Sequence, residues 1–141
     1  MDIITLSTDF YIRFSDCKEI LQKGNRPYLM VLISVDNITF AIPFRSHIRH
    51  NFAYWTDKEN RCGLDFTKAV VILSENDIAA HNVQIRQNEF NATKGKEYFI
   101  TQKFTTFIRH YKKAYSRTDI ERNKMLIDIS ALQYFAELFI K

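Results

Sequence analysis

The sequence has few of the residues that loosen or interrupt a chain, with 3 glycines and 2 prolines among 141 residues. Flexible linkers and low-complexity tracts are rich in such residues, so their scarcity predicts a chain that folds throughout. No internal repeat is visible. We therefore interpret residues 1–141 as a single domain, which is long enough to bury a hydrophobic core.

Cysteines and long apolar runs are also scarce. Cys17 and Cys62 are the only cysteines and form no Cys-x-x-Cys motif, which is typical of free thiols in a reducing compartment. No apolar run approaches the length of a membrane span, and the N-terminus lacks the basic and apolar regions of a signal peptide. These absences predict a soluble, cytoplasmic protein without a disulfide framework.

The apolar residues that are present are concentrated in residues 28–44. The chain is 46% hydrophobic and 14% aromatic, which excludes disorder. Residues 28–35 are apolar at nearly every position, as in a strand buried on both faces. Asp36 and Asn37 tolerate the positive φ of a tight turn, and the following residues alternate as one strand. The pattern predicts a central β-hairpin. Pro43 has no N–H to donate, so we expect regular pairing to stop there or the strand to lie at an edge.

Directly after Pro43 the composition changes to polar residues. The segment contains the candidate catalytic residues Arg45, Ser46, His47, Arg49 and His50. Arginine holds phosphoryl oxygens as a fork, and histidine exchanges protons near neutral pH. A rigid hairpin that presents these groups with a hydroxyl is suited to phosphate chemistry, although a solvated loop has the same local pattern. No cysteine or carboxylate lies beside the two histidines, so we predict neither a metal nor another cofactor.

Positive charge is concentrated in a second segment. The net charge of the chain is +4, and residues 94–117 contain seven basic residues against one acidic residue. That segment is therefore +6 and the remainder of the chain is −2. A concentrated basic face predicts a polyanionic partner, of which nucleic acid is the commonest. An ordinary solvated helix face is the alternative.

Shorter patterns predict the first half of the remaining elements. A strand covers residues 3–6, and a helix capped by Ser7 or Thr8 runs toward Gly24, with a possible break near Ser15. The apolar face of this helix consists of Phe10, Phe14, Cys17 and Leu21. Residues 51–60 are polar apart from three aromatic residues, and we interpret them as a loop folded over the polar cluster. Residues 64–73 contain a further buried strand, followed by a turn at residues 74–77.

The C-terminal third is predicted to be helical. Residues 97–115 form the strongest helix, whose apolar stripe consists of Phe104, Phe107, Ile108, Tyr111 and Tyr115. A capping box of Thr118 and Glu121 opens another helical region, which restarts near Ser130. Strands followed by terminal helices indicate an α+β fold, with helices laid on an antiparallel sheet.

Several of these blocks together resemble a known family. The Arg-Pro-Tyr run at residues 26–28, the hairpin end at residues 40–46, residues 63–69 and the helix at residues 98–111 occur in the order found in the toxins of type III toxin–antitoxin systems. These are the ToxN/AbiQ-like endoribonucleases, including the CptN and TenpN relatives. The similarity runs along most of the chain, and Pro43 with Ser46 is its strongest part. Arg45, His47 and Ile48 replace the hydroxyl residue, proline and lysine of the family pattern.

The resemblance implies a fold, an activity and a partner. The fold is a compact antiparallel sheet core like that of the MazF/Kid ribonucleases, partly barrel-shaped and flanked by helices. The activity is metal-independent, sequence-preferring cleavage of mRNA. The partner is an antitoxin RNA of pseudoknotted repeats, which the toxin processes and then holds in a closed toxin–RNA assembly. Since Ile48 occupies the lysine position, His47, Arg49 and His50 are the alternatives for the basic group.

Metal-free RNA cleavage uses the ribose 2′-hydroxyl as the nucleophile, so the protein supplies alignment, proton transfer and charge stabilisation. Ser46 would bind a phosphate oxygen or the 2′-hydroxyl, an arginine would hold the phosphoryl group, and a histidine would transfer protons. Binding away from the cut is expected from Arg26, Tyr28, Lys68, Lys96, Lys103, Arg109, Lys112 and Lys113. The competing functions are a non-catalytic RNA-binding module and a protein-interaction domain with an incidental basic helix.

Overall fold

A computed structural model describes residues 1–22 and 27–140, and its centre is the predicted hairpin. Strand β2 (Met30–Val35) pairs with β3 (Ile38–Arg45) in antiparallel register from Met30 opposite Pro43 to Val35 opposite Ile38. Both turn residues have positive φ, 51° at Asp36 and 67° at Asn37. This geometry matches the right-handed twist of the two strands and confirms the predicted tight turn.

Pro43 lies where β3 changes its neighbour. The backbone N–H of Phe44 donates to the carbonyl oxygen of Leu29 at 3.0 Å, so the nitrogen of Pro43 points to the opposite side of β3. On that side, one neighbouring strand pairs only as far as Ala41 and another begins at Phe44. The absence of a backbone N–H at Pro43 therefore removes no hydrogen bond from the sheet. The register with β2 ends at Pro43, but β3 is a central strand and goes on to pair with β5 as far as Arg45, so the expected stop or edge position is only partly found.

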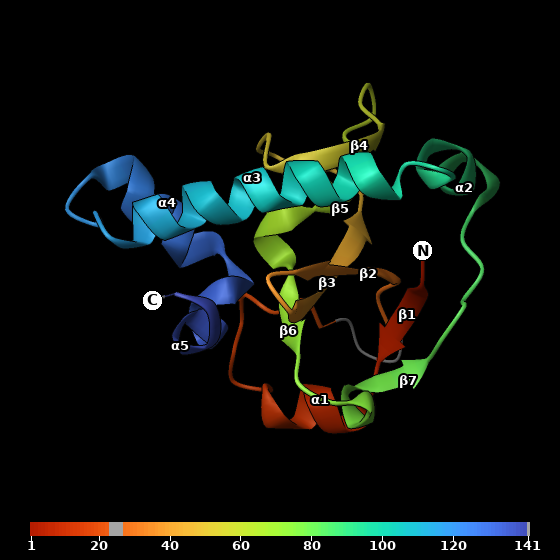
Figure 1. The fold of residues 1–141 in the computed structure, drawn as a ribbon, viewed down its shortest axis with the longest axis horizontal. Helices are drawn as coiled ribbons and strands as arrows, with labels where there is room; N and C mark the ends of the chain where they lie inside the picture. The colour runs from red at the N-terminus through yellow and green to blue at the C-terminus, as the bar shows by residue number, and fades with distance from the viewer. Residues whose placement is uncertain (23–26, 141) are drawn as a thin grey trace.

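Seven strands of the described residues form one antiparallel sheet (Figure 1). The order is β4-β5-β3-β2-β1-β7, and β6 pairs with β3 beside β5. The further strands are β1 (Ile3–Leu6), β4 (Ala53–Asp57), β5 (Cys62–Asp65), β6 (Val70–Ile72) and β7 (Ile78–Ala80). The α+β class and the antiparallel sheet are confirmed. Among the described strands, β4 and β7 remain edges, so the sheet is not closed into a barrel.

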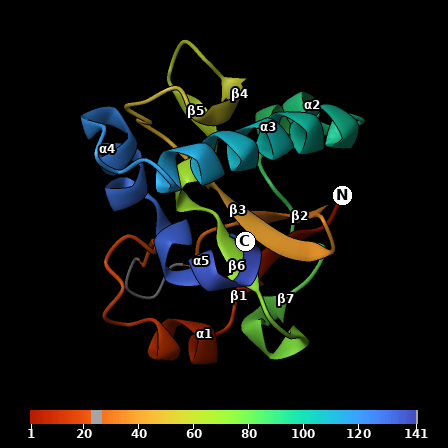
Figure 2. The same ribbon diagram turned by 60° about the vertical axis from the view of Figure 1, so that its left-hand side comes forward.

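The long helix α3 (Glu97–Tyr115) has the predicted bounds and crosses one side of the sheet (Figures 1 and 2). The Phe104 ring contacts Phe40 of β3 at 5.1 Å and Phe66 at 5.3 Å between ring centroids. Four residues of the predicted stripe are buried, whereas Tyr115 is exposed at the end of the helix. The aromatic stripe is therefore part of the core.

The C-terminal region consists of α4 (Glu121–Ile129), a 3-10 turn η3 (Ala131–Phe135) and α5 (Ala136–Phe139). The predicted restart at Ser130 is confirmed, because η3 begins at the next residue. The capping box is wrong: the N-cap of α4 is Ile120, without a side-chain cap bond. None of the helices in residues 1–22 and 27–140 has the length and apolar composition needed to cross a membrane.

The first helix is shorter than predicted. Helix α1 (Thr8–Arg13) has the expected Ser7 cap, but it ends before Phe14. The chain then turns, the Phe14 ring packs on Phe135 at 5.2 Å, and Ile20 is buried where the periodicity had placed Leu21. Tertiary packing thus replaces the last two predicted turns of helix, and the helix ends close to the possible break predicted near Ser15. The predicted end at Gly24 lies outside the described residues.

The interpretation of residues 51–60 as a loop is wrong, because β4 occupies their centre. Ala53 pairs with Asp65, and Trp55 pairs with Gly63. Gly63 permits this close approach, since a Cβ there would lie 2.1 Å from the backbone oxygen of Tyr54. The predicted strand in residues 64–73 is present as β5 and β6, separated by the 3-10 turn η1 (Phe66–Lys68). The predicted turn at 74–77 forms η2 (Glu75–Asp77), whereas β7 and α2 (Gln87–Thr93) were not predicted.

Candidate functional site

A cleft of about 900 Å³ lies at the end of β3. Its walls come from the segment before β2, the end of β3, the β4–β5 pair, and the residues that lead into α2. Three of the five candidate catalytic residues line it: Arg45, Ser46 and His47. Tyr28, a candidate RNA-binding residue, lines the same cleft. The structure therefore brings part of the predicted site together in one concave surface, which we name the β3 cleft.

Ser46 and His47 are exposed at the mouth of the β3 cleft. His47 adopts a φ of 58°, a left-handed conformation that turns the chain sharply where β3 ends. The turn brings the Nδ1 atom of His47 to 3.2 Å from the Ser46 hydroxyl. This contact involves one ring nitrogen only, so Nε2 remains available to a ligand. The pair supplies a hydroxyl and an imidazole to the same point of the cleft.

Arg45 is held by a buried carboxylate. Its Nη1 donates to Oδ2 of Asp65 at 2.8 Å, and the Asp65 side chain has no exposed surface. The other oxygen, Oδ1, accepts bonds from the Thr67 backbone N–H at 3.0 Å and the Thr67 hydroxyl at 2.7 Å. The Arg45 side chain retains 30% exposure and lines the cleft. Asp65 thus fixes the direction in which the fork of Arg45 points.

His50 has a structural role in the same network. The backbone N–H of Phe52 donates to His50 Nδ1 at 3.0 Å, so the ring proton lies on Nε2. That nitrogen is 3.0 Å from Asp65 Oδ1 and 3.2 Å from the Thr67 hydroxyl. Burial raises the pKa of Asp65, but the hydrogen bonds from His50, Thr67 and Arg45 outweigh it and hold the pKa below its usual range. Both nitrogens of His50 are occupied, which leaves it no free group for proton transfer.

Arg61 holds the backbone between the two histidines and was not predicted. Its Nε donates to the Ile48 carbonyl at 2.6 Å and its Nη2 to the His50 carbonyl at 2.5 Å. The guanidinium carbon lies 4.6 Å from the centre of the Trp55 ring. Ile48, which stands where the toxins that the sequence resembles have a lysine, is buried with 1% exposure. Arg49 points to solvent and does not line the β3 cleft, so of the three alternatives for the basic group only His47 lies in it.

The other predicted RNA-binding residues are dispersed. Arg26 lies outside the described residues. Lys68 donates to the carbonyl oxygen of Ile129 at 2.7 Å, and burial, together with the Arg45 charge, lowers the pKa of Lys68 despite the opposing charge of Asp65. On α3, Lys103 and Lys112 are nine residues apart and point in directions about 180° apart. Arg109 and Lys113 share the outer face, and Lys96 precedes the helix. The predicted basic face is thus a charged surface around α3 and not one stripe.

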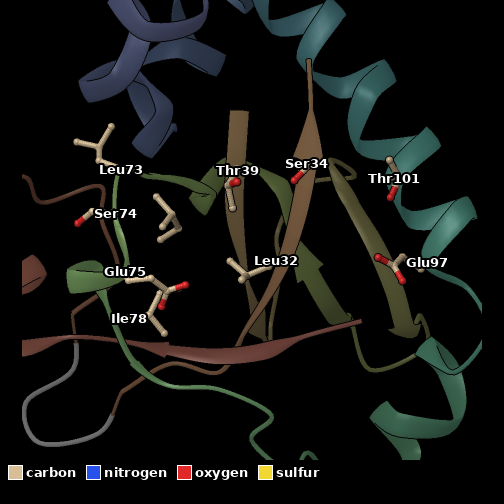
Figure 3. A pocket seen from close by; sticks show the side chains of 10 residues that line it. Leu32, Ser34, Thr39, Leu73, Ser74, Glu75, Ile78, Glu97 and Thr101 are labelled. Atoms are coloured by element: carbon tan, nitrogen blue, oxygen red, sulfur yellow. The ribbon is translucent and has the colours of Figure 1, made fainter. Parts of the chain in front are cut away.

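A second hollow, of about 520 Å³, lies over the β2–β3 face between α3 and the β6–β7 connection (Figure 3). Its charged residues are Glu75 and Glu97, and it contains none of the predicted site residues. Two carboxylates disfavour a polyanion, which leaves the β3 cleft as the better candidate site. Within residues 1–22 and 27–140, no three His, Cys, Asp or Glu residues are grouped so that they could hold a metal ion.

The comparisons with known proteins leave the family open. Family models, curated proteins and solved structures give no match to this chain.

Sequence reasoning missed the wall of the β3 cleft that α2 supplies. Arg86 and Glu89 line the cleft, with the Arg86 Nε 3.5 Å from the Glu89 carboxylate. Glu89 is 8% exposed, which is unusual for a carboxylate. No pattern pointed to them, because residues 78–93 have no clear periodicity. The cleft therefore offers two arginines, one histidine, one serine and one carboxylate.

Proposed function

We propose that this protein is a metal-independent endoribonuclease, the toxin of a type III toxin–antitoxin system. The observation that carries the proposal is the β3 cleft, which Arg45, Ser46, His47 and Arg86 all line. Two guanidinium groups and a hydroxyl suit an RNA phosphate, and the imidazole suits proton transfer. The resemblance along the hairpin end adds the family, and a compact sheet with flanking helices is consistent with a MazF/Kid-like core.

The reaction at this site is an internal displacement at phosphorus. The 2′-hydroxyl oxygen attacks the adjacent phosphate as its proton passes to a base, and the bond to the 5′-oxygen breaks as that oxygen receives a proton. The product carries a 2′,3′-cyclic phosphate. His47 Nε2 is our candidate for one proton transfer, and the Glu89 carboxylate is our candidate for the second. Arg45, oriented by Asp65, stabilises the charge on the phosphoryl oxygens.

The proposed partners are a substrate mRNA and a cognate antitoxin RNA of pseudoknotted repeats. The exposed basic residues around α3, away from the β3 cleft, support binding of a folded polyanion over a large surface. In this arrangement the antitoxin occupies the toxin and forms a closed toxin–RNA assembly. Tandem short repeats in the DNA just upstream of the gene would agree with this partner.

Cleavage of a mixed-sequence RNA by the purified protein in EDTA tests the proposal. We expect cyclic phosphate ends, and a loss of roughly 10²–10⁴-fold in rate for His47→Ala. Ser46→Ala should also lower the rate, while Arg49→Ala is the matched control because Arg49 is exposed outside the cleft. Loss of activity in EDTA, restored by a divalent ion, would contradict metal independence. A wild-type rate for His47→Ala would remove this residue from the chemistry.

One observation favours the second candidate, a non-catalytic RNA-binding module. His50 is fully engaged by backbone and carboxylate, and Arg45 is tied to Asp65. A single histidine is then left in the cleft, which is enough for phosphate binding. This candidate predicts RNA binding without cyclic phosphate products, so the same assay separates the two functions.

A further inference from the structure

Three large aromatic side chains are exposed where α2 meets α3. Phe90 is 45% exposed, Tyr98 is 69% exposed and Phe99 is 59% exposed. Phe90 lies on α2 and the other two lie in the first turn of α3, so all three occur within ten residues of the chain. Clustered apolar surface of this kind on a folded protein generally marks a binding site. We name these residues, with Lys94 and Lys96, the α2–α3 corner.

The three rings are not displaced members of the core. In α3 the core contacts begin at Ile100 and continue at Phe104, both with 0% exposure. At about 100° per residue, Tyr98 and Phe99 point away from the direction of Ile100 and Phe104. The rings of Tyr98 and Phe99 instead touch each other edge to face, with centroids 5.8 Å apart. Packing therefore gives no reason for large aromatic residues at these positions.

Cations accompany the rings. Lys94 Nζ lies 5.7 Å from the centre of the Phe90 ring, and Lys96 Nζ lies 5.4 Å from the centre of the Phe99 ring. Both lysines are exposed, and Gly95 between them has a φ of 69°, which makes the turn between the helices. Exposed rings next to ammonium groups fit a ligand that has both flat faces and negative charge. Unpaired nucleotides have this chemistry, with a base for the ring and a phosphate for the lysine.

The corner is continuous with the β3 cleft through α2. Asn88 and Glu89 line the cleft, whereas Phe90 and Lys94 line a neighbouring groove of about 730 Å³. Gln84, just before α2, lines both hollows. A strand bound in the cleft can therefore continue along this groove to Phe90 and Lys94, and the groove ends at Glu97, directly before Tyr98 and Phe99 in the first turn of α3.

We propose that the α2–α3 corner stacks the bases of single-stranded RNA that extends from the β3 cleft. The proposal rests on the proposed function for the identity of the strand, but the stacking itself requires no cleavage. It assigns a substrate class: an unpaired segment, because the faces of paired bases are already stacked within a duplex. Stacking on the rings gives no sequence preference, because every base has a flat face.

The test measures binding of an unstructured, mixed-sequence RNA 12-mer by fluorescence anisotropy. The 141-residue chain with His47→Ala is the parent, so that the RNA stays uncut. Removing one ring that stacks on a base should weaken RNA binding roughly 5- to 150-fold. The double variant Tyr98→Ala/Phe99→Ala should therefore lose at least as much affinity as the removal of one such ring. Phe99→Trp should retain affinity. Tyr115→Ala is the matched control, since this exposed tyrosine lies at the other end of α3.

The double variant should keep the thermal midpoint of the parent, because both side chains are exposed. Lys96→Gln should reduce the slope of log affinity against log salt by about one. An RNA affinity of the double variant within twofold of the parent would overturn the proposal, as would equal binding of the same sequence in a duplex. If the α2–α3 corner binds another protein and not RNA, the double variant would keep the RNA affinity of the parent. RNA binding that depends on the rings without any cleavage by the wild type would instead refute only the proposed function.

Discussion

Asp65→Asn is the substitution that most directly tests how the site is held. The carboxylate accepts three hydrogen bonds and has a fourth donor beside it: Arg45 donates to Oδ2, two groups of Thr67 donate to Oδ1, and His50 Nε2 lies 3.0 Å from Oδ1. All four groups are donors. An asparagine of the same shape keeps one oxygen for the Oδ1 side, but its NH₂ group then faces the guanidinium of Arg45. The substitution therefore removes the charge and opposes two donors, while it leaves the volume unchanged.

The expected loss follows from the burial of the two partners. Removing one member of a buried ion pair costs about 3–5 kcal/mol, because the other charge stays buried and unpaired. Arg45 keeps 30% of its side chain exposed and can turn toward water. We therefore expect the smaller value of about 2–3 kcal/mol, near that of a charged hydrogen bond, for Asp65→Asn. For a chain of this length that corresponds to roughly 7–10 °C in the thermal midpoint.

Thermal unfolding followed by circular dichroism measures this loss, with Asp119→Asn as the matched control. Asp119 also binds an arginine, Arg117, at 2.9 and 3.0 Å, but both side chains are exposed. Exposed ion pairs contribute little, so the control should unfold at the wild-type temperature. A midpoint for Asp65→Asn within about 3 °C of wild type, or about 1 kcal/mol, would refute the network argument.

The pH dependence gives the same prediction an independent check. The folded pKa of Asp65 is below its usual value, so its stabilising effect is fully present above the unfolded pKa of about 4 and is lost as the pH falls through the folded pKa. The difference in midpoint between wild type and Asp65→Asn should therefore be constant near neutral pH. It should narrow below about pH 4. A difference that widens in acid would show that another group controls this region.

Two further predictions concern other parts of the sheet. Gly63→Ala should destabilise the protein by about 1–3 kcal/mol in a denaturant titration. The new Cβ would lie 2.1 Å from the Tyr54 carbonyl oxygen and force β4 away. An unchanged denaturation midpoint would contradict this contact. Hydrogen bonds to Glu75 and Asp2 raise the pKa of His81. An NMR titration should therefore find the pKa of His81 above the usual value of about 6.5, and the Glu75→Gln variant should have a lower His81 pKa than wild type. A His81 titration that this substitution leaves unchanged would show that the Glu75 carboxylate is not a partner.

Much of the fold could be predicted because local pattern and tertiary environment agree there. The two turn residues Asp36 and Asn37 tolerate the φ that a hairpin of this twist requires, and the flanking residues are apolar on the correct faces. The bounds of α3 could be predicted because its buried stripe recurs from Ile100 to Ala114, over about four turns. In both places one periodicity is sustained long enough to exclude the alternatives.

The errors occur where distant contacts decide the local structure. Strand β4 lies at an edge of the sheet, so solvent exposure gives it the composition of a loop, and only its partner β5 makes it a strand. The last predicted turns of the first helix are absent because Phe14 and Ile20 pack against other parts of the chain. Edge position and long-range packing leave no periodic signal in a single sequence.

The polar segment after Pro43 shows what sequence reasoning about a site can and cannot give. The composition identified this segment as a candidate site, because arginine guanidinium groups, a hydroxyl and two imidazoles follow a rigid strand. It could not distinguish His47 from His50, since the distinction depends on Asp65, which is 15 residues beyond His50 and buried beneath it. The carboxylate and the Phe52 amide occupy both nitrogens of His50, whereas the left-handed turn at His47 directs that ring to the β3 cleft. Equivalent residues in the sequence thus acquire different positions, one holding the loop and the other facing the β3 cleft. Their alanine variants should differ accordingly, with His50→Ala lowering stability and His47→Ala lowering only the rate of the proposed RNA cleavage.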